Sequence, residues 1–225
     1  MKRTKLRDRL LPDYTRGEEI FNMVTHIVGG GFGVIALATC VVKAFLVGNA
    51  YDIVGAFIFG FAMVILYTMS SVYHGLKPET AKKVMQIIDH CTIFILIAGT
   101  YTPICLSAIR PEKPGWAWTI FGIVWGVSAL GLTLNAIDLK KYNVFSLICY
   151  IALGWCIVIP GKTVISVLHP KAFSLILLGG VSYSIGAVLY AIAGRKVHRY
   201  MHSVFHIFVV IGSVLQYLGI LFYIF

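Results

Sequence analysis

Residues 201–225 read MHSVFHIFVVIGSVLQYLGILFYIF, a segment without Asp, Glu, Lys or Arg. A helix needs about 20 apolar residues to cross the hydrocarbon core of a bilayer, so the segment predicts a membrane-spanning helix. It begins with His202 and His206, which share one helix face because they are four residues apart. Ionisable groups at a membrane edge are costly and usually functional. The pair therefore indicates a metal or proton site at one end of this helix.

The composition of the whole chain agrees with that segment. The chain has 225 residues, of which 59% are hydrophobic and 12% charged, and its mean hydropathy is +0.86. These values exclude a soluble globular protein and indicate an integral membrane protein. We predict an all-α fold, a seven-helix transmembrane bundle that forms one domain over residues 18–225, after a basic arm over residues 1–17. The predicted spans are residues 20–47, 51–75, 85–108, 116–138, 143–163, 172–194 and 200–225.

The basic residues predict the orientation of the bundle. The arm and the connections on its side hold 14 Lys and Arg residues, against 5 on the opposite side. The positive-inside rule then places the N-terminus in the cytoplasm and the C-terminus outside. Topology and contacts with anionic membrane lipids therefore explain the net charge of +10, and no nucleic-acid partner is expected.

Cysteine, glycine and proline predict how the helices pack. The five cysteines lie in apolar segments without the spacing of a metal site, which indicates small buried side chains rather than disulfides or ligands. Pairs of glycines four residues apart, Gly29 with Gly33 and Gly122 with Gly126, predict close approach of neighbouring helices. Pro160 is expected to kink the fifth span, whose freed carbonyl groups then need other partners.

Polar side chains inside the spans gather at the predicted cytoplasmic end. They are Glu19, Asn22 and His26 in the first span, Ser70 and His74 at the end of the second, Asp89 at the start of the third, and His202 and His206 in the seventh. The three residues of the first span form one stripe, since they lie at positions i, i+3 and i+7 of a helix. All these groups are therefore expected at one depth, in the inner-leaflet half of the membrane.

Three of them, His74, His202 and His206, form a ligand set that suits Zn²⁺. Neutral imidazole is a common zinc ligand, and three protein ligands leave a fourth position open, as in catalytic sites. A water bound there would have a pKa of about 7 and could react as hydroxide. Asp89 is then the candidate base, and Ser70 is the candidate group for orienting a histidine or polarising a substrate carbonyl.

Each assignment has a structural alternative. Ser70 could bond back to a carbonyl of its own helix, and Asp89 could cap the start of a helix. The stripe of Glu19, Asn22 and His26 is more simply explained as buried polar support for the first helix than as further metal ligands.

In this order along the chain, the motifs resemble those of the haemolysin III family, the bacterial branch of the progestin and adipoQ receptor family. The motifs are Glu19-x-x-Asn22-x-x-x-His26, Ser70-x-x-x-His74, Asp89 and His202-x-x-x-His206, and they extend over nearly the whole chain from Glu19 onward. By similarity to adiponectin receptors and alkaline ceramidases, the resemblance implies Zn²⁺ on the three histidines, Asp89 beside the zinc-bound water, and metal-dependent amide hydrolysis. It also implies a bacterial plasma membrane, and the family name implies cytolysis, which none of these residues explains.

Two functions of different classes follow. One is a zinc-dependent hydrolase of a lipid amide or ester that enters from the inner leaflet. The other is a pore-forming or lipid-sensing protein in which zinc only joins the second and seventh helices. An open coordination position that faces Asp89 favours hydrolysis, whereas direct ligation by Asp89 favours a structural ion. A retinal protein is disfavoured because the seventh span has no lysine, and haem is disfavoured because paired axial histidines usually come from two helices.

The predicted orientation can be tested with reporter fusions. A reporter fused after Phe225 should be exported, whereas one inserted in the loop at Lys140 should remain in the cytoplasm, because the basic connections stay inside. Alkaline phosphatase and green fluorescent protein activities measure the two locations. The opposite pattern would move the whole histidine cluster to the outer face.

Overall fold

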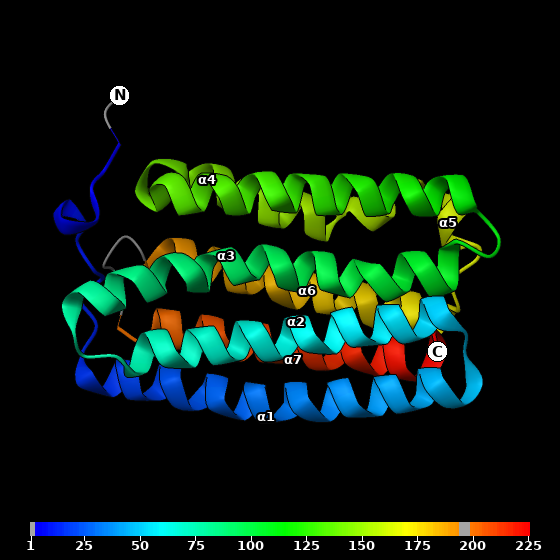
Figure 1. Cartoon of the computed structure of the whole chain (residues 1–225), viewed down its shortest axis with the longest axis horizontal. Coiled ribbons are helices and arrows are strands. Elements are labelled where there is room, and N and C mark those ends of the chain that lie inside the picture. The colour runs from blue at the N-terminus through cyan, green and yellow to red at the C-terminus, as the bar shows by residue number, and fades with distance from the viewer. Residues whose placement is uncertain (1–2, 194–198) are drawn as a thin grey trace.

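The computed structural model describes residues 3–193 and 199–225, which form a helical bundle (Figure 1). The long helices are α1 (Arg16–Val47), α2 (Ala50–Gly75), α3 (Glu79–Pro103), α4 (Pro114–Gly154), α6 (Pro170–Ala193) and α7 (Met201–Tyr223). The short elements are η1 (Leu6–Asp8), the π-helix η2 (Ile104–Ile109), η3 (Cys156–Val158) and α5 (Lys162–Ile165). In the described part of the chain, six helices are long and apolar enough to cross a membrane. The predicted all-α membrane bundle is confirmed.

Helix α4 contains two of the predicted spans. Its 41 residues would extend about 60 Å if straight, roughly twice the thickness of a hydrocarbon core. Asp138 interrupts it with φ −158° and ψ 90°. Beyond this kink the chain turns back, because the Asn135 side chain accepts a hydrogen bond from Ser146 Oγ at 2.6 Å and donates one to the Tyr150 hydroxyl at 3.2 Å. The turn lies where the sequence separates the fourth span from the fifth, so α4 is two helices, and the six long helices of the described residues comprise seven long helical segments. Figure 1 shows α4 doubling back on itself.

The predicted fifth span, 143–163, is wrong as a continuous helix. Regular helix ends at Gly154, and the 3₁₀ turn η3 and the four-residue α5 follow. The break begins at Trp155, whose φ of −97° and ψ of 2° are not helical. Pro160 lies beyond it, and because it has no backbone N–H to donate, it does not restore the regular helix. Gly161 then adopts a φ of 56°, which glycine reaches at little cost.

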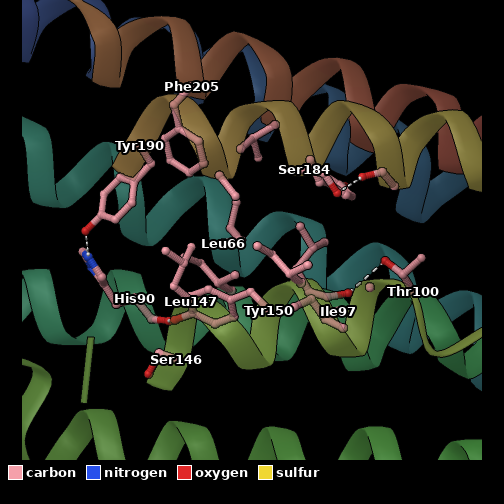
Figure 2. Close-up of a pocket in the computed structure, with 18 of the residues that line it drawn as sticks. Leu66, His90, Ile97, Thr100, Ser146, Leu147, Tyr150, Ser184, Tyr190 and Phe205 are labelled. Atoms are coloured by element: carbon pink, nitrogen blue, oxygen red, sulfur yellow. Dashed lines mark hydrogen bonds between the residues drawn. The ribbon is translucent and has the colours of Figure 1, made fainter. Parts of the chain in front are cut away.

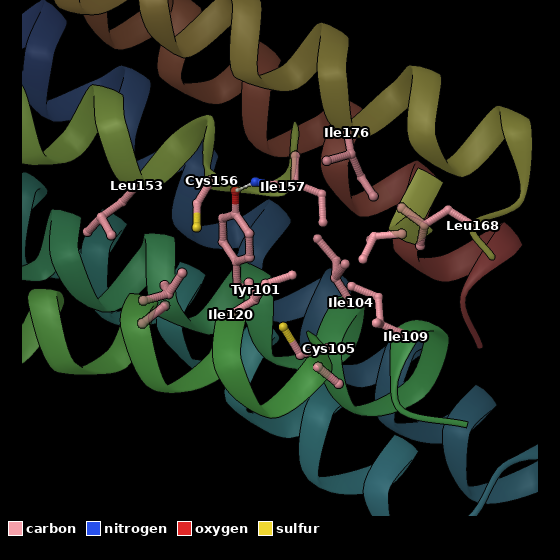
Figure 3. Close-up of a cluster of buried hydrophobic side chains, with 14 of the residues drawn as sticks. Tyr101, Ile104, Cys105, Ile109, Ile120, Leu153, Cys156, Ile157, Leu168 and Ile176 are labelled. Carbon is pink, nitrogen blue, oxygen red and sulfur yellow. Dashed lines mark hydrogen bonds between the residues drawn. The ribbon is translucent and has the colours of Figure 1, made fainter. Parts of the chain in front are cut away.

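A buried tyrosine satisfies the backbone at this break. The Tyr101 hydroxyl donates to the carbonyl of Gly154 at 3.1 Å and accepts from the Ile157 amide at 3.0 Å. Figure 3 shows Tyr101 within a buried cluster that also contains Cys105, Ile120, Leu153 and Ile176. Because hydrocarbon offers no hydrogen-bond partners, such side-chain partners help a helix to break inside a membrane.

The predictions about small residues are confirmed in part. All five cysteines are buried and free. A Cβ atom at Gly29 would lie 2.6 Å from the Tyr67 ring, and one at Gly33 would also be crowded by α2, so this pair does permit close helix packing. The prediction for Gly122 and Gly126 is wrong. Both are exposed and would meet nothing within 4 Å among the described residues, because they lie on the outer side of α4.

A different glycine of α4, Gly131, makes the close contact with α3, and it provides a matched test. A methyl group at Gly131 would collide with the ring of Phe94, so Gly131→Ala should destabilise the bundle by about 1–3 kcal/mol through overpacking. Gly122→Ala should leave stability unchanged or raise it by up to about 1 kcal/mol, because alanine favours helix. The Tm of each purified variant in detergent measures the difference. Equal changes in both variants would contradict the packing.

Candidate metal centre

Three histidines from two helices meet at one end of the bundle. His74 lies at the end of α2, and His202 and His206 lie in the first two turns of α7. One nitrogen atom from each ring lies within 4.8 Å of the other two, and all three residues are buried. The Nε2 atoms of His202 and His206 are 3.1 Å apart. The structure therefore brings together the three histidines that the sequence predicts as ligands.

Two of the rings are oriented by hydrogen bonds from helix α1. His74 Nδ1 donates to Glu19 Oε2 at 2.6 Å, because a carboxylate only accepts. His74 Nε2 is consequently left with a lone pair, and it is buried without a hydrogen-bond partner among the described residues. His206 Nδ1 donates to the backbone carbonyl of Asn22 at 3.3 Å, which again leaves Nε2 as the lone-pair nitrogen. Such outer hydrogen bonds are typical of metal-binding histidines, since they fix the tautomer and the ring.

This geometry fits a small cation that prefers nitrogen ligands. Zinc binds histidine nitrogen at about 2.0–2.1 Å with tetrahedral angles, which puts two such nitrogens roughly 3.4 Å apart. The observed 3.1 Å between His202 Nε2 and His206 Nε2 is close to that value. A buried nitrogen without a partner is costly, and a bound cation would remove this cost at His74 Nε2.

The polar stripe of α1 surrounds the histidines. Glu19 and the Asn22 backbone accept from two of the rings, and the Asn22 side chain accepts from Ser203 Oγ at 2.7 Å. His26 stacks on His206 with ring centroids 3.7 Å apart and 11° between planes. Both ring nitrogens of His26 are buried without a partner in the described residues. None of the three stripe residues belongs to the group of ligand atoms within 4.8 Å.

Ser70 lies one turn before His74 and is only 1% exposed. Among the described residues its hydroxyl makes no hydrogen bond, unlike that of its neighbour Ser71, which donates to the Tyr67 carbonyl at 2.7 Å. The alternative in which Ser70 bonds back to its own helix is therefore not observed. Its hydroxyl retains its hydrogen-bonding capacity beside the histidines.

Asp89 lies well inside α3, which begins at Glu79, so it does not cap the helix. Its carboxylate is 3.6 Å from the Nδ1 atom of His90 and lies on the wall of the cavity described next. It is not one of the ligand atoms that lie within 4.8 Å of one another. Asp89 thus shares the cavity wall with His202 and His206 but does not belong to the three-histidine group.

A cavity begins at the histidines and extends into the membrane region. His26, Ser70, Asp89, His202 and His206 line its polar end. The cavity volume is about 150 Å³, roughly ten times what one water molecule needs. Figure 2 shows Leu66, Ile97 and Leu147 on the walls of its apolar part. At the helical rise of α7, the lining residue Gln216 is about 15 Å beyond His206, so the cavity is long enough for an extended chain.

Two residues of the cavity wall, His90 and Tyr190, could not be identified from the sequence. His90 Nδ1 donates to the Gln86 carbonyl at 2.9 Å, so in the neutral ring Nε2 accepts from the Tyr190 hydroxyl at 3.1 Å (Figure 2). On a helix, His90 is turned by about 100° from its neighbour Asp89, so the two side chains do not share a face. The sequence spacing therefore does not connect His90 with the site. Tyr190 lies in an apolar helix, where one tyrosine carries no signal.

The remaining histidines lie away from the site or outside the described residues. His169 is exposed at the opposite end of the bundle, where it stacks on Tyr223 with ring centroids 4.8 Å apart. His198 lies outside the described residues. His169 therefore has no place in the cluster.

The sequence analysis also misses Tyr14, which belongs to the N-terminal arm. Its ring stacks on His202 with centroids 5.1 Å apart and 23° between planes, and it lies 5.9 Å from the His74 ring. Burial raises the pKa of its hydroxyl, so this side chain remains neutral. Because Tyr14 precedes every apolar segment, no periodic pattern connects it with the site.

Comparison with known proteins identifies the family to which the chain belongs. The family model described as "Haemolysin-III related" matches residues 14–217. The "Hemolysin-3 homolog" of Bacillus subtilis (strain 168) is 35% identical over 210 residues, which cover 93% of this chain and 96% of the relative. "Hemolysin-3" of Bacillus cereus is 33% identical over 207 residues, 92% of each chain. The "Monocyte to macrophage differentiation factor" of Homo sapiens is 24% identical over 205 residues, 81% of this chain and 82% of the relative. This chain thus belongs to the haemolysin III family of integral membrane proteins, within the wider progestin and adipoQ receptor family.

Proposed function

We propose that the protein is a zinc-dependent hydrolase of lipid amides or esters, acting at the inner leaflet of the bacterial plasma membrane. The observation that carries this proposal is a three-histidine cluster at the polar end of a long cavity with mainly apolar walls. A lipid likewise has a polar end and an apolar part, since its carbonyl group adjoins the headgroup and its chain is apolar. The substrate carbonyl would lie at the histidines while the acyl chain fills the cavity.

The side chains around the cluster supply the groups that hydrolysis needs. When bound, zinc polarises a carbonyl group and lowers the pKa of a coordinated water to about 7. Asp89 would take the proton of the attacking water on its carboxylate and return it to the leaving nitrogen or oxygen as the C–N or C–O bond breaks. Ser70 Oγ and a His26 ring nitrogen would donate to the substrate carbonyl oxygen, since both residues line the cavity and the His26 nitrogens have no other partner in the described residues.

A second candidate is a pore-forming or lipid-sensing protein with a structural ion. It is favoured by the position of the ligands on two helices, α2 and α7, which an ion would join at one end. The name "Hemolysin-3" of the Bacillus cereus relative also favours a cytolytic activity. The two candidates differ in what Asp89 does, and this difference can be measured.

Metal binding is the first test of the proposal. Purified protein should contain about one zinc ion per chain, and the double variant His202→Ala, His206→Ala should contain none, because one imidazole cannot retain the ion. Removal of zinc from the parent should also lower its Tm, since the ion binds only the folded state. His169→Ala, at the opposite end of the bundle, should keep its zinc. Elemental analysis decides, and zinc retained by the double variant would exclude this site.

The role of Asp89 separates an enzyme from a scaffold. Asp89→Asn should retain zinc and Tm but lose hydrolysis of a panel of lipid amides and esters by a hundredfold or more, about the usual contribution of a positioned base. Glu112→Gln, the same chemical change at an exposed turn, should have no effect. If Asp89 is a ligand, the variant should instead lose zinc and stability together. A parent that hydrolyses nothing in the panel would favour the scaffold or pore.

A further inference from the structure

Helix α1 accepts hydrogen bonds from two of the three histidines, whereas the third, His202, is paired only with its fellow candidate ligand, because its Nε2 lies 3.1 Å from His206 Nε2. Glu19 and Asn22 accept from His74 and His206, respectively. His202 Nδ1 is buried and has no hydrogen-bond partner among the described residues. If both Nε2 atoms bind the ion, the contacts left to orient the His202 ring are aromatic, and the one nearest to parallel stacking is Tyr14, at 5.1 Å and 23°. An offset stack in this range is a stabilising contact.

The arm that carries Tyr14 is attached to the turn inside α4. Thr4 donates its backbone N–H to Asp138 Oδ2 at 2.7 Å, and Arg3 Nε donates to the Ile137 carbonyl at 2.7 Å. Asp138 is only 4% exposed and is the residue at which α4 turns back. The first described residues are thereby fixed to the fourth and fifth spans.

The middle of the arm is attached to α3. Arg9 is only 7% exposed, and its Nη2 atom donates to Gln86 Oε1 at 2.9 Å. Lys83 Nζ donates to the Arg7 carbonyl at 3.3 Å. The side chain of Arg7, two residues before Arg9, is 77% exposed. These two arginines have the same charge and segment but differ in burial, so Arg9 is an anchor and Arg7 is not.

Together these contacts make the arm a packed element of the bundle. Figure 1 shows it crossing one end of the molecule, from the turn of α4 to the start of α1. This is the end at which α7 begins and the three histidines lie. The basic arm is thus more than a topology signal with lipid contacts, because part of its charge is used for attachment to the protein.

We propose that the arm is part of the metal centre, in which Tyr14 is a positioning residue for His202 and Arg9 anchors the arm over the ion. The proposal rests on metal binding by the three histidines, but it does not depend on hydrolysis. Stacking on Tyr14 does for His202 what hydrogen bonds do for the other two rings. The aromatic ring supplies this contact, so phenylalanine at position 14 should serve equally well.

The rate of zinc loss tests the proposal. Full-length zinc-loaded protein in detergent is mixed with an excess of a water-soluble chelator, and zinc transfer is followed by absorbance. Tyr14→Ala should release zinc about two- to tenfold faster than the parent, the factor expected for one aromatic pair. Tyr14→Phe should release it at the parental rate. If the hydroxyl rather than the ring held His202, Tyr14→Phe would release zinc as fast as Tyr14→Ala.

The two arginines provide the matched control. Arg9→Ala should speed zinc release by about tenfold or more, because a hydrogen bond made by a charged group holds the arm in place. Arg7→Ala, which removes the same charge from an exposed position, should release zinc at the parental rate. Equal rates for the two arginine variants would overturn the anchoring role, even if Tyr14→Ala failed to fold.

Other outcomes separate this inference from the enzyme proposal. Parental rates in both Tyr14→Ala and Arg9→Ala, at unchanged Tm, would overturn the role of the arm and leave hydrolysis untouched. A parent that binds zinc but hydrolyses no lipid would overturn the enzyme, and the arm would keep its role if the release rates follow the expected order. A parent without zinc would overturn both.

Discussion

A polar group inside a bilayer must find its partner within the protein, because the hydrocarbon offers none. This constraint governs the described structure at every depth. At the break in the fifth span, the Tyr101 hydroxyl takes the place of helix hydrogen bonds. At the turn of α4, Asn135 satisfies groups from both halves of the hairpin. At the histidine end, helix α1 provides the acceptors for two rings. One nitrogen that still lacks a partner, His74 Nε2, belongs to the group of histidines where a cation fits.

The fold could be predicted largely from the sequence because length and hydropathy determine which segments cross a bilayer. The break after Gly154 could not be placed to the residue, since Pro160 indicates a kink but not how far the helix is lost before it. The Gly122 and Gly126 motif failed for a related reason. A spacing of four places two glycines on one helix face, but it does not say whether that face contacts another helix or the exterior.

For the candidate site, the sequence indicated which side chains share a helix face but not which helices meet. The i, i+4 spacings found His202 and His206 and paired Ser70 with His74, because regular helix fixes which side chains share a face. The encounter of α2 with α7 and the approach of α1 follow from tertiary packing, which no local pattern encodes. Tyr14 and Tyr190 contribute aromatic and hydroxyl groups from elements whose sequence gives no hint of the site. The sequence therefore indicates the three candidate ligands but not the residues that surround them.

The attachment of the arm to Asp138 has a consequence for biosynthesis. Thr4 and Asp138 are separated by 134 positions, and His202 follows later still. The arm is translated first, yet it cannot dock until the fourth and fifth spans have entered the membrane. The histidine cluster itself is complete only when the last helix is inserted. This end of the bundle therefore cannot be complete before the last helix is in place, because the arm contacts both Asp138 and His202.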